Sequence, residues 1–193
     1  AATAWLVPAW LAPFAVLLVW VVATGGLHLD GFGDACDGLL ATTTPERRLE
    51  IMKDPRVGSW ATIGLILLLL GKFVAVGNGG MWALVVAPVA GRWAMTVAAW
   101  RFPYARSQGT GGYFRQGLGR REVIIASLIA GTILAVLTWL DWRVLIVLVV
   151  APITLWAVAT FAQRRLGGGI TGDIYGAICE LCELLVLFAI ALL

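Results

Sequence analysis

Hydrophobic residues form long runs along this chain, and polar residues gather in the short segments between them. Six runs approach the length of about 20 residues that an α-helix needs to cross a lipid bilayer. They are residues 5–24, 60–76, 81–100, 123–140, 144–161 and 174–193. Tryptophans lie near several run ends, where an indole ring favours the headgroup level. The pattern predicts an all-α, polytopic membrane bundle of about six transmembrane helices, with residues 1–193 as a single membrane domain.

The composition agrees with this prediction. Hydrophobic residues make up 61% of the 193 residues and charged residues 13%, whereas soluble domains have roughly 25% charged residues. Six spans use about 120 residues and leave no room for a separate soluble domain. The net charge of +3 is too small to favour nucleic acid as a partner, and three cysteines argue against a disulfide scaffold. The expected surroundings are the lipid bilayer.

Basic residues are distributed unevenly over the connections between the runs. They concentrate in the first, third and fifth connections, which include Arg47, Arg48, Lys53, Arg56, Arg101, Arg106, Arg115, Arg120, Arg121, Arg164 and Arg165. Cytoplasmic connections of membrane proteins collect Lys and Arg. We therefore expect these three connections to face the cytoplasm of a prokaryotic cell, and the two ends of the chain to lie on the far side.

Acidic residues gather in two clusters at opposite ends of the sequence. Six of the eleven acidic residues belong to them: Asp30, Asp34 and Asp37 after the first run, and Asp173, Glu180 and Glu183 at the start of the last. The topology places both clusters on the cytoplasmic face. Because a bundle can bring its first and last helices together, we expect the clusters to converge there.

The first cluster occupies GGLHLDGFGDACDGL, residues 25–39. In a helix, Asp30, Asp34 and Asp37 would share one face, where like charges repel unless a cation neutralises them. Oxygen ligands suit Mg²⁺, or alternatively Mn²⁺, better than zinc. His28, the only histidine, is equally consistent with a catalytic base and with a structural hydrogen-bond donor. Part of this glycine-rich stretch could also be loop.

The second cluster begins in a glycine-rich turn and enters the last run. Asp173 and Glu180 are seven residues apart and would share one helical face. Gly169 and Gly172 would expose backbone amides at the helix start, where phosphate binds well. Between the clusters, residues 104–121 mix arginines with glycines, as expected of a flexible cationic cover over a polyphosphate. Together these parts suit displacement at phosphorus.

Each feature also has a structural interpretation. The first three aspartates could pair with Arg47, Arg48 and Lys53 in a salt network at the membrane interface. The arginine-rich loop could serve only as an orientation signal towards anionic lipid. Cys179 and Cys182 imitate a metal motif, but their apolar helix favours packing.

Three motifs resemble the adenosylcobinamide-GDP ribazoletransferase (cobalamin synthase) family. They are residues 25–39, LEIMKDPRVGS at 49–59 and GGGITGDIYGAICEL at 167–181, and Lys72, Arg92 and residues 104–106 add to the similarity. The resemblance implies a Mg²⁺-dependent membrane enzyme. That enzyme joins adenosylcobinamide-GDP to alpha-ribazole or its 5'-phosphate and releases GMP.

Charge, position and this resemblance together give each candidate residue a role. Asp30, Asp34, Asp37, Asp173 and Glu180 are expected to ligate the metal. His28 or one of the first three aspartates is expected to remove the hydroxyl proton. Lys53, Arg56, Lys72 and Arg106 would neutralise the GMP leaving group.

The resemblance leaves some questions open. Members of the family usually carry a further amino-terminal stretch, and whether it completes the site is not decided by the motifs. Whether the chain forms homo-oligomers or associates with other corrinoid enzymes also stays open.

Two other functions compete with this interpretation. Asp34, Asp37, Gly38 and Ala41 match the opening of the CDP-alcohol phosphotransferase motif. The rest of that motif fails, because Ile51, Pro55 and Ser59 stand where it needs a glycine and two aspartates. A divalent-cation transporter is less favoured, because carriers place their ions near the bilayer midplane.

Overall fold

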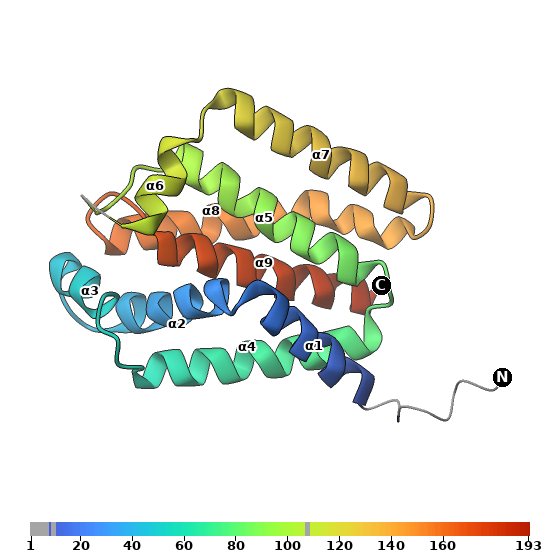
Figure 1. Cartoon of the computed structure of the whole chain (residues 1–193), viewed down its shortest axis with the longest axis horizontal. Helices are drawn as coiled ribbons and strands as arrows, with labels where there is room; N and C mark the ends of the chain where they lie inside the picture. Colours follow the sequence, from blue (N-terminus) through green and yellow to red (C-terminus); the bar gives the residue numbers. More distant parts are fainter. Residues whose placement is uncertain (1–7, 9–10, 107–108) are drawn as a thin grey trace.

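The computed structural model describes residues 8, 11–106 and 109–193, which fold into a bundle of helices (Figure 1). The longer helices are α1 (Leu11–Thr24), α2 (Leu27–Leu40), α4 (Ser59–Asn78), α5 (Ala83–Arg101), α7 (Arg120–Thr138), α8 (Val147–Arg165) and α9 (Gly172–Leu192). The shorter elements are α3 (Pro45–Ile51), α6 (Thr110–Gln116) and the 3₁₀ helix η1 (Trp142–Ile146). Five segments of this described part are long and apolar enough to cross a membrane: α4, α5, α7, η1 with α8, and α9. The all-α membrane fold is confirmed.

The first predicted span differs from a straight helix. Residues 5–7 and 9–10 of that run lie outside the described residues, and α1 has 14 residues, about 21 Å of helix. The chain then turns by 90° into α2. Gly25 and Gly26 make this turn with φ angles of 61° and 67°, a left-handed conformation that glycine adopts at little cost. Within the described part of the chain, a sixth span exists only if α1 and α2 are counted as one broken span.

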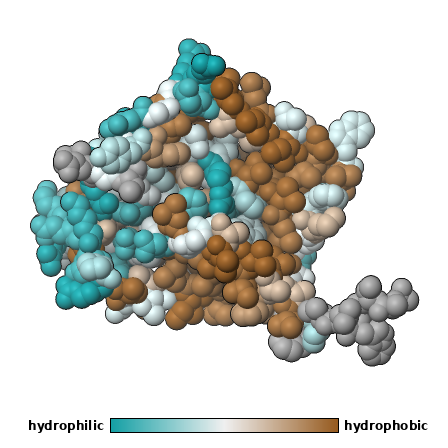
Figure 2. All heavy atoms as spheres, viewed as in Figure 1, coloured by the Kyte–Doolittle hydropathy of each residue, from teal (hydrophilic) through white to brown (hydrophobic). Residues whose placement is uncertain are grey.

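The three arginine-rich connections lie at one end of the bundle. Figure 1 shows α3, α6 and the connection from α8 to α9 together at the left, while α9 ends at the right. In the face drawn in Figure 2, hydrophilic residues gather at the same left end and hydrophobic residues cover most of the rest. We call the left end the charged end. The predicted gathering of the odd-numbered connections is confirmed.

Helix α9 forms the centre of the bundle. It packs against α2, α4, α5 and α8. Of its 18 most hydrophobic consecutive residues, two thirds are buried, a larger share than in any other candidate span. Cys179 and Cys182 are both fully buried in it, which confirms their role as small packing residues. The acidic residues of α9 are therefore held in fixed positions relative to four neighbouring helices.

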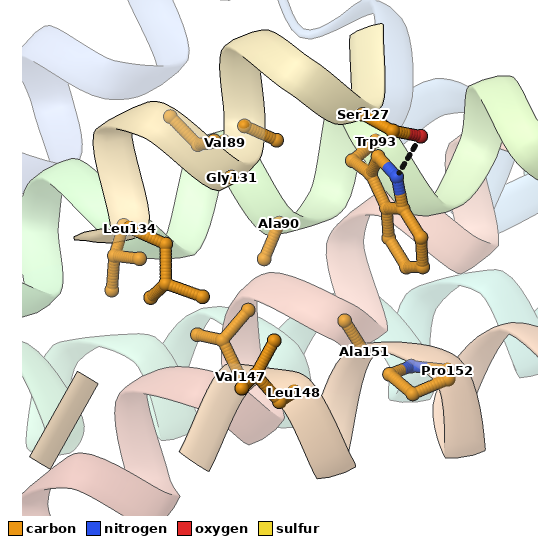
Figure 3. Close-up of a pocket in the computed structure, with 12 residues that line it drawn as sticks. Val89, Ala90, Trp93, Ser127, Gly131, Leu134, Val147, Leu148, Ala151 and Pro152 are labelled. Atoms are coloured by element: carbon orange, nitrogen blue, oxygen red, sulfur yellow. Dashed lines mark hydrogen bonds between the residues drawn. The ribbon is translucent and has the colours of Figure 1, made fainter. Parts of the chain in front are cut away.

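Helix α7 packs mainly against α5, and a cavity of about 210 Å³ separates α5, α7 and α8 (Figure 3). Apolar side chains line this cavity, including Leu134 of α7 and Val147 of α8. Its two polar groups satisfy each other, because the Trp93 indole donates a hydrogen bond of 3.0 Å to Ser127. The remaining residues that line the cavity are apolar.

Candidate active site

Helices α2 and α9 cross with their backbones in contact. A Cβ atom on Gly31 would lie 3.1 Å from the Cα atom of Asp173, and one on Gly176 would lie 2.9 Å from the backbone oxygen of His28. Only glycine permits this approach on both sides, as in the small-residue contacts of membrane helices. The crossing places Asp30 and Asp34 of α2 beside Asp173 of α9, so that their charges interact. The expected convergence of the two clusters is confirmed for these three residues.

A cavity of about 330 Å³ opens beside Asp30 and Asp34 at the charged end. Lys53 and Arg56, from the connection between α3 and α4, line it as well. Arg56 donates two side-chain hydrogen bonds to Asp54, which lower the pKa of that carboxyl and keep it ionised at neutral pH. The cavity thus combines two carboxylates of α2 with two cations and the Asp54 carboxylate of the connection between α3 and α4.

Contacts at Arg106 and its neighbours join the connection between α5 and α6 to two others, the one between α3 and α4 and the one between α8 and α9. The Arg106 guanidinium lies 2.8 Å from Asp173 and donates a hydrogen bond of 3.2 Å to the backbone oxygen of Met52. Two backbone hydrogen bonds fix the segment that carries it, from Ile170 to Pro103 and from Ala105 to Ile170. The structure therefore brings the predicted residues Arg106 and Asp173 into direct contact.

The carboxylate of Asp37 caps a helix, whereas those of Asp30 and Asp34 line the cavity. The Asp37 carboxylate accepts hydrogen bonds from the backbone amides of Gly58 at 2.7 Å and Ala61 at 2.9 Å. These amides belong to the start of α4, where unpaired donors need an acceptor. A side chain on Gly58 would collide with the carboxylate, since its Cβ would lie 2.5 Å away. Asp37 therefore connects the first motif with the second as a helix cap.

The salt network expected as a structural alternative does not form among the described residues. Arg48 is 4% exposed and donates hydrogen bonds to the backbone oxygens of Gly38 and Leu39, at the end of α2. Arg47 pairs with Glu50 at the surface. Asp30 and Asp34 are thus left facing the cavity.

Gly169, shortly before α9, and Gly172, its first residue, lie in close backbone contacts that the sequence did not indicate. A Cβ on Gly169 would lie 2.8 Å from the backbone nitrogen of Ala105, and Gly172 lies against the Cα atom of Gly111 in α6. The backbone at both positions is therefore covered. This arrangement corrects the expected picture of an open phosphate cradle, although a role of Gly169 and Gly172 towards substrate stays a prediction.

Lys72 and Glu180 lie apart from the aspartates, which corrects the placement inferred from the sequence. Lys72 of α4 pairs with Glu180 at 2.6 Å and with Glu183, and Arg92 of α5 also pairs with Glu183. We call these four residues the ion quartet. Two helical turns, about 10 Å, separate Glu180 from Asp173, too far to share one ion. Sharing a helical face does not place two residues at the same depth.

His28 lies between the two groups. Its backbone touches Gly176, and its side chain interacts electrostatically with Arg92, Glu180 and Lys72 of the quartet. Its predicted role as a base stays untested, and Asp30 and Asp34 are the acidic groups that line the cavity itself.

The donor set fits a hard cation that arrives with phosphate. Among residues 8, 11–106 and 109–193, no three His, Cys, Asp or Glu side chains are grouped to hold a metal ion by themselves. Mg²⁺ often takes only one or two carboxylates and completes its shell with water and phosphate oxygens. Asp30 and Asp34 on the cavity wall can supply such a pair.

Sequence reasoning assigned no role to Glu183 or Arg92. The signal was present, because Glu183 follows Glu180 by three residues and Arg92 interrupts an apolar run. An ionisable residue inside a span needs a partner, so the two basic and two acidic residues within the runs could have been matched with each other.

Comparison with known proteins gives a consistent result. The family model for cobalamin-5-phosphate synthase matches residues 1–191. The adenosylcobinamide-GDP ribazoletransferase of Pseudomonas syringae pv. syringae (strain B728a) is 42% identical over 187 residues, which cover 92% of this chain and 74% of the relative. The protein of the same name from Herpetosiphon aurantiacus is 41% identical over 200 residues, covering 100% of this chain and 79% of the relative.

A third protein of this name, from Desulforamulus reducens, is 39% identical over 181 residues, covering 91% of this chain and 71% of the relative. No solved structure matches the chain. The comparisons give no support to a CDP-alcohol phosphotransferase or a cation transporter. The chain belongs to the cobalamin-5-phosphate synthase family.

Proposed function

We propose that this chain joins adenosylcobinamide-GDP to alpha-ribazole, or to its 5'-phosphate, in a Mg²⁺-dependent reaction at the charged end. The products are adenosylcobalamin, or its phosphate, and GMP. This is the last step in assembly of the cobalamin nucleotide loop, and family membership supports it.

The convergence of Asp30, Asp34 and Asp173 beside a cavity with cationic walls is the observation that carries the proposal. Three acidic side chains at the edge of a bilayer repel one another and lose hydration. A divalent cation relieves both costs. Lys53 and Arg56 line the same cavity, and they can hold the negative charge of a diphosphate.

The reaction needs a deprotonated hydroxyl and a stabilised leaving group. In the proposed step, the ribazole 3'-hydroxyl oxygen attacks the phosphorus bound to cobinamide, and the bond from this phosphorus to the GMP oxygen breaks. Asp30 or Asp34 accepts the hydroxyl proton, since both carboxylates face the cavity. Lys53 and Arg56 offset the charge that develops on GMP. Bound Mg²⁺ supplies further neutralisation of the phosphate oxygens.

The charged end would face the cytoplasm. The connections at this end include Lys53, Arg56 and Arg106, and the positive-inside rule favours such connections on the cytoplasmic side. The relatives come from bacteria, which supports a prokaryotic cell membrane as the location.

The decisive experiment is a transfer assay with the purified chain in detergent. Adenosylcobinamide-GDP, alpha-ribazole and Mg²⁺ should yield GMP and the complete corrinoid in equal amounts, and removing divalent cations with EDTA should stop the reaction. CDP-diacylglycerol with an alcohol serves as the control and should yield no CMP. Absence of GMP from a folded, Mg²⁺-supplied protein would contradict the proposal.

A further inference from the structure

Three buried polar atoms at the charged end have no hydrogen-bond partner among the described residues. They are the hydroxyl oxygens of Tyr104 and Tyr175 and the Nε atom of Arg106. Tyr175 is only 4% exposed. Buried polar groups in folded proteins are nearly always paired, and leaving one unpaired costs free energy. Three such atoms in one region indicate a place that a ligand completes.

The two tyrosine rings lie together, and the segment that carries Tyr104 also carries Arg106. The rings of Tyr104 and Tyr175 are 6.5 Å apart between centroids. Arg106 follows Tyr104 by two residues and contacts Asp173, which precedes Tyr175 by two residues. We call Tyr104, Tyr175 and Arg106 the phenol cluster. Through Arg106 it contacts Asp173 of the proposed site.

Helix α6 covers the phenol cluster mainly with backbone. Cβ atoms on Gly111 and Gly112 would both lie 3.2 Å from atoms of the Tyr104 ring, so these glycines rest directly on it. Phe114 covers Tyr175, with 6.2 Å between the ring centroids. The side chain of Arg115 attaches α6 to α5 through one hydrogen bond of 3.2 Å to the backbone of Ala99. A flat ligand would reach an aromatic face once α6 moves off the rings and off its backbone contact between Gly111 and Gly172.

The chemistry of the cluster suits a nitrogen heterocycle with a polar edge. Tyrosine rings stack on nucleobases, and the hydroxyls and Nε can donate to ring acceptors. Guanine presents two such acceptors, O6 and N7, on one edge. The benzimidazole of alpha-ribazole offers a single ring nitrogen and would leave two of the three groups unpaired. We propose that the phenol cluster is the subsite for the guanine base of the nucleotide substrate, an inference that rests on the proposed function.

The test measures nucleotide binding by calorimetry with the full chain, Mg²⁺ and either GDP or ADP. Wild-type protein should bind GDP about tenfold more tightly than ADP, because adenine lacks the O6 acceptor. Tyr175→Phe and Tyr104→Phe each keep the ring and remove one hydroxyl. Each should weaken GDP binding about threefold to tenfold and leave ADP binding nearly unchanged.

Thermal unfolding without nucleotide separates this role from a structural one. Tyr175→Phe removes an unpaired buried hydroxyl, so the Tm of the free protein should stay equal or rise while GDP binding weakens. Tyr113→Phe is the matched control, since Tyr113 is a tyrosine of α6 that is 73% exposed. It should bind GDP as the wild type does.

The inference is overturned if the wild type binds GDP and ADP equally or does not bind GDP. It is also overturned if both phenylalanine variants bind GDP normally, or if they raise only the KM for alpha-ribazole. A hydroxyl-dependent preference for GDP in a protein that makes no GMP would support the subsite and contradict the proposed transfer reaction, so the two failures are distinguishable.

Discussion

Helix α9 carries acidic residues in two contrasting regions. In its first turn, Asp173 lies beside Asp30 and Asp34. Asp173 pairs with Arg106, and the other two carboxylates line a cavity. Two turns further on, Glu180 and Glu183 are matched by Lys72 and Arg92, and both glutamates are at most 3% exposed. The first region has surplus negative charge and space for a ligand. The second has balanced charge, and its Lys72 and Glu180 line a cavity of only about 10 Å³, although a cavity of about 410 Å³ opens beside Arg92.

This difference shows how charge inside a membrane protein can serve binding or folding. The quartet is balanced in charge, with three members buried and Arg92 partly exposed, and it connects α4, α5 and α9. An unbalanced group at a cavity is stabilised only when a cation arrives. The quartet joins α9 to α4 and α5 through ion pairs, and a role of Lys72 towards substrate stays a prediction.

The largest expected effect is on stability and concerns the quartet. Glu183→Gln leaves two cations opposite one anion in a buried place, which should cost about 3 to 5 kcal/mol of stability. Thermal unfolding in detergent should show a clear loss of Tm. The double variant Lys72→Met with Glu183→Gln restores the balance and should recover part of it. An unchanged Tm in the single variant would show that the quartet is not structural.

The next effect is on catalysis and concerns the cavity. Asp34→Asn should lower kcat of the transfer reaction by about a hundredfold to a thousandfold, because it removes a carboxylate from the reacting groups. Thermal unfolding should show a Tm close to that of the wild type. The measurement is GMP release at saturating substrates, and a wild-type rate would remove Asp34 from the site.

Asp37→Ala tests whether Asp37 acts as a helix cap, in contrast to Asp30 and Asp34, which line the cavity. Loss of the bonds to Gly58 and Ala61 should cost about 1 to 2 kcal/mol of stability, because a helix start loses its acceptor. The Mg²⁺ concentration for half-maximal transfer should stay that of the wild type. A large rise in that concentration would instead place Asp37 among the metal ligands, as its position in the sequence suggested.

The smallest effect concerns Lys53, one of the two cations that line the cavity. Lys53→Ala should raise the KM for adenosylcobinamide-GDP about fivefold with little change in kcat, since an exposed cation contributes modestly to holding a diphosphate. The KM for alpha-ribazole should not change. Arg47→Ala is a suitable control, because Arg47 pairs with Glu50 away from the cavity.

The sequence predicted most of the fold because spanning length and charge placement are local properties. Run lengths located five spans, and arginine counts located the charged end. The end of the first run at residue 24 and the glycine-rich stretch after it indicated a break, but an apolar run does not reveal the 90° change of direction. Two adjacent glycines were its only sign.

The site was predicted in part. Helical spacing and the topology were enough to bring Asp30 and Asp34 together with Asp173. Spacing alone could not show that Asp37 turns towards α4, or that Glu180 lies two turns deeper than Asp173. Those outcomes depend on which helix packs against α9 at each depth, which is set by tertiary contacts such as Gly31 on Asp173 and Lys72 on Glu180.

Mn²⁺ binding, followed by electron paramagnetic resonance in the presence of GDP, compares the two regions of α9 most directly. We predict that Asp34→Asn weakens Mn²⁺ binding at least about tenfold, because the ion loses a carboxylate ligand. Glu180→Gln, measured on the folded fraction, should bind Mn²⁺ as the wild type does. Unchanged binding in Asp34→Asn together with lost binding in Glu180→Gln would contradict the assignment of the metal to the charged end.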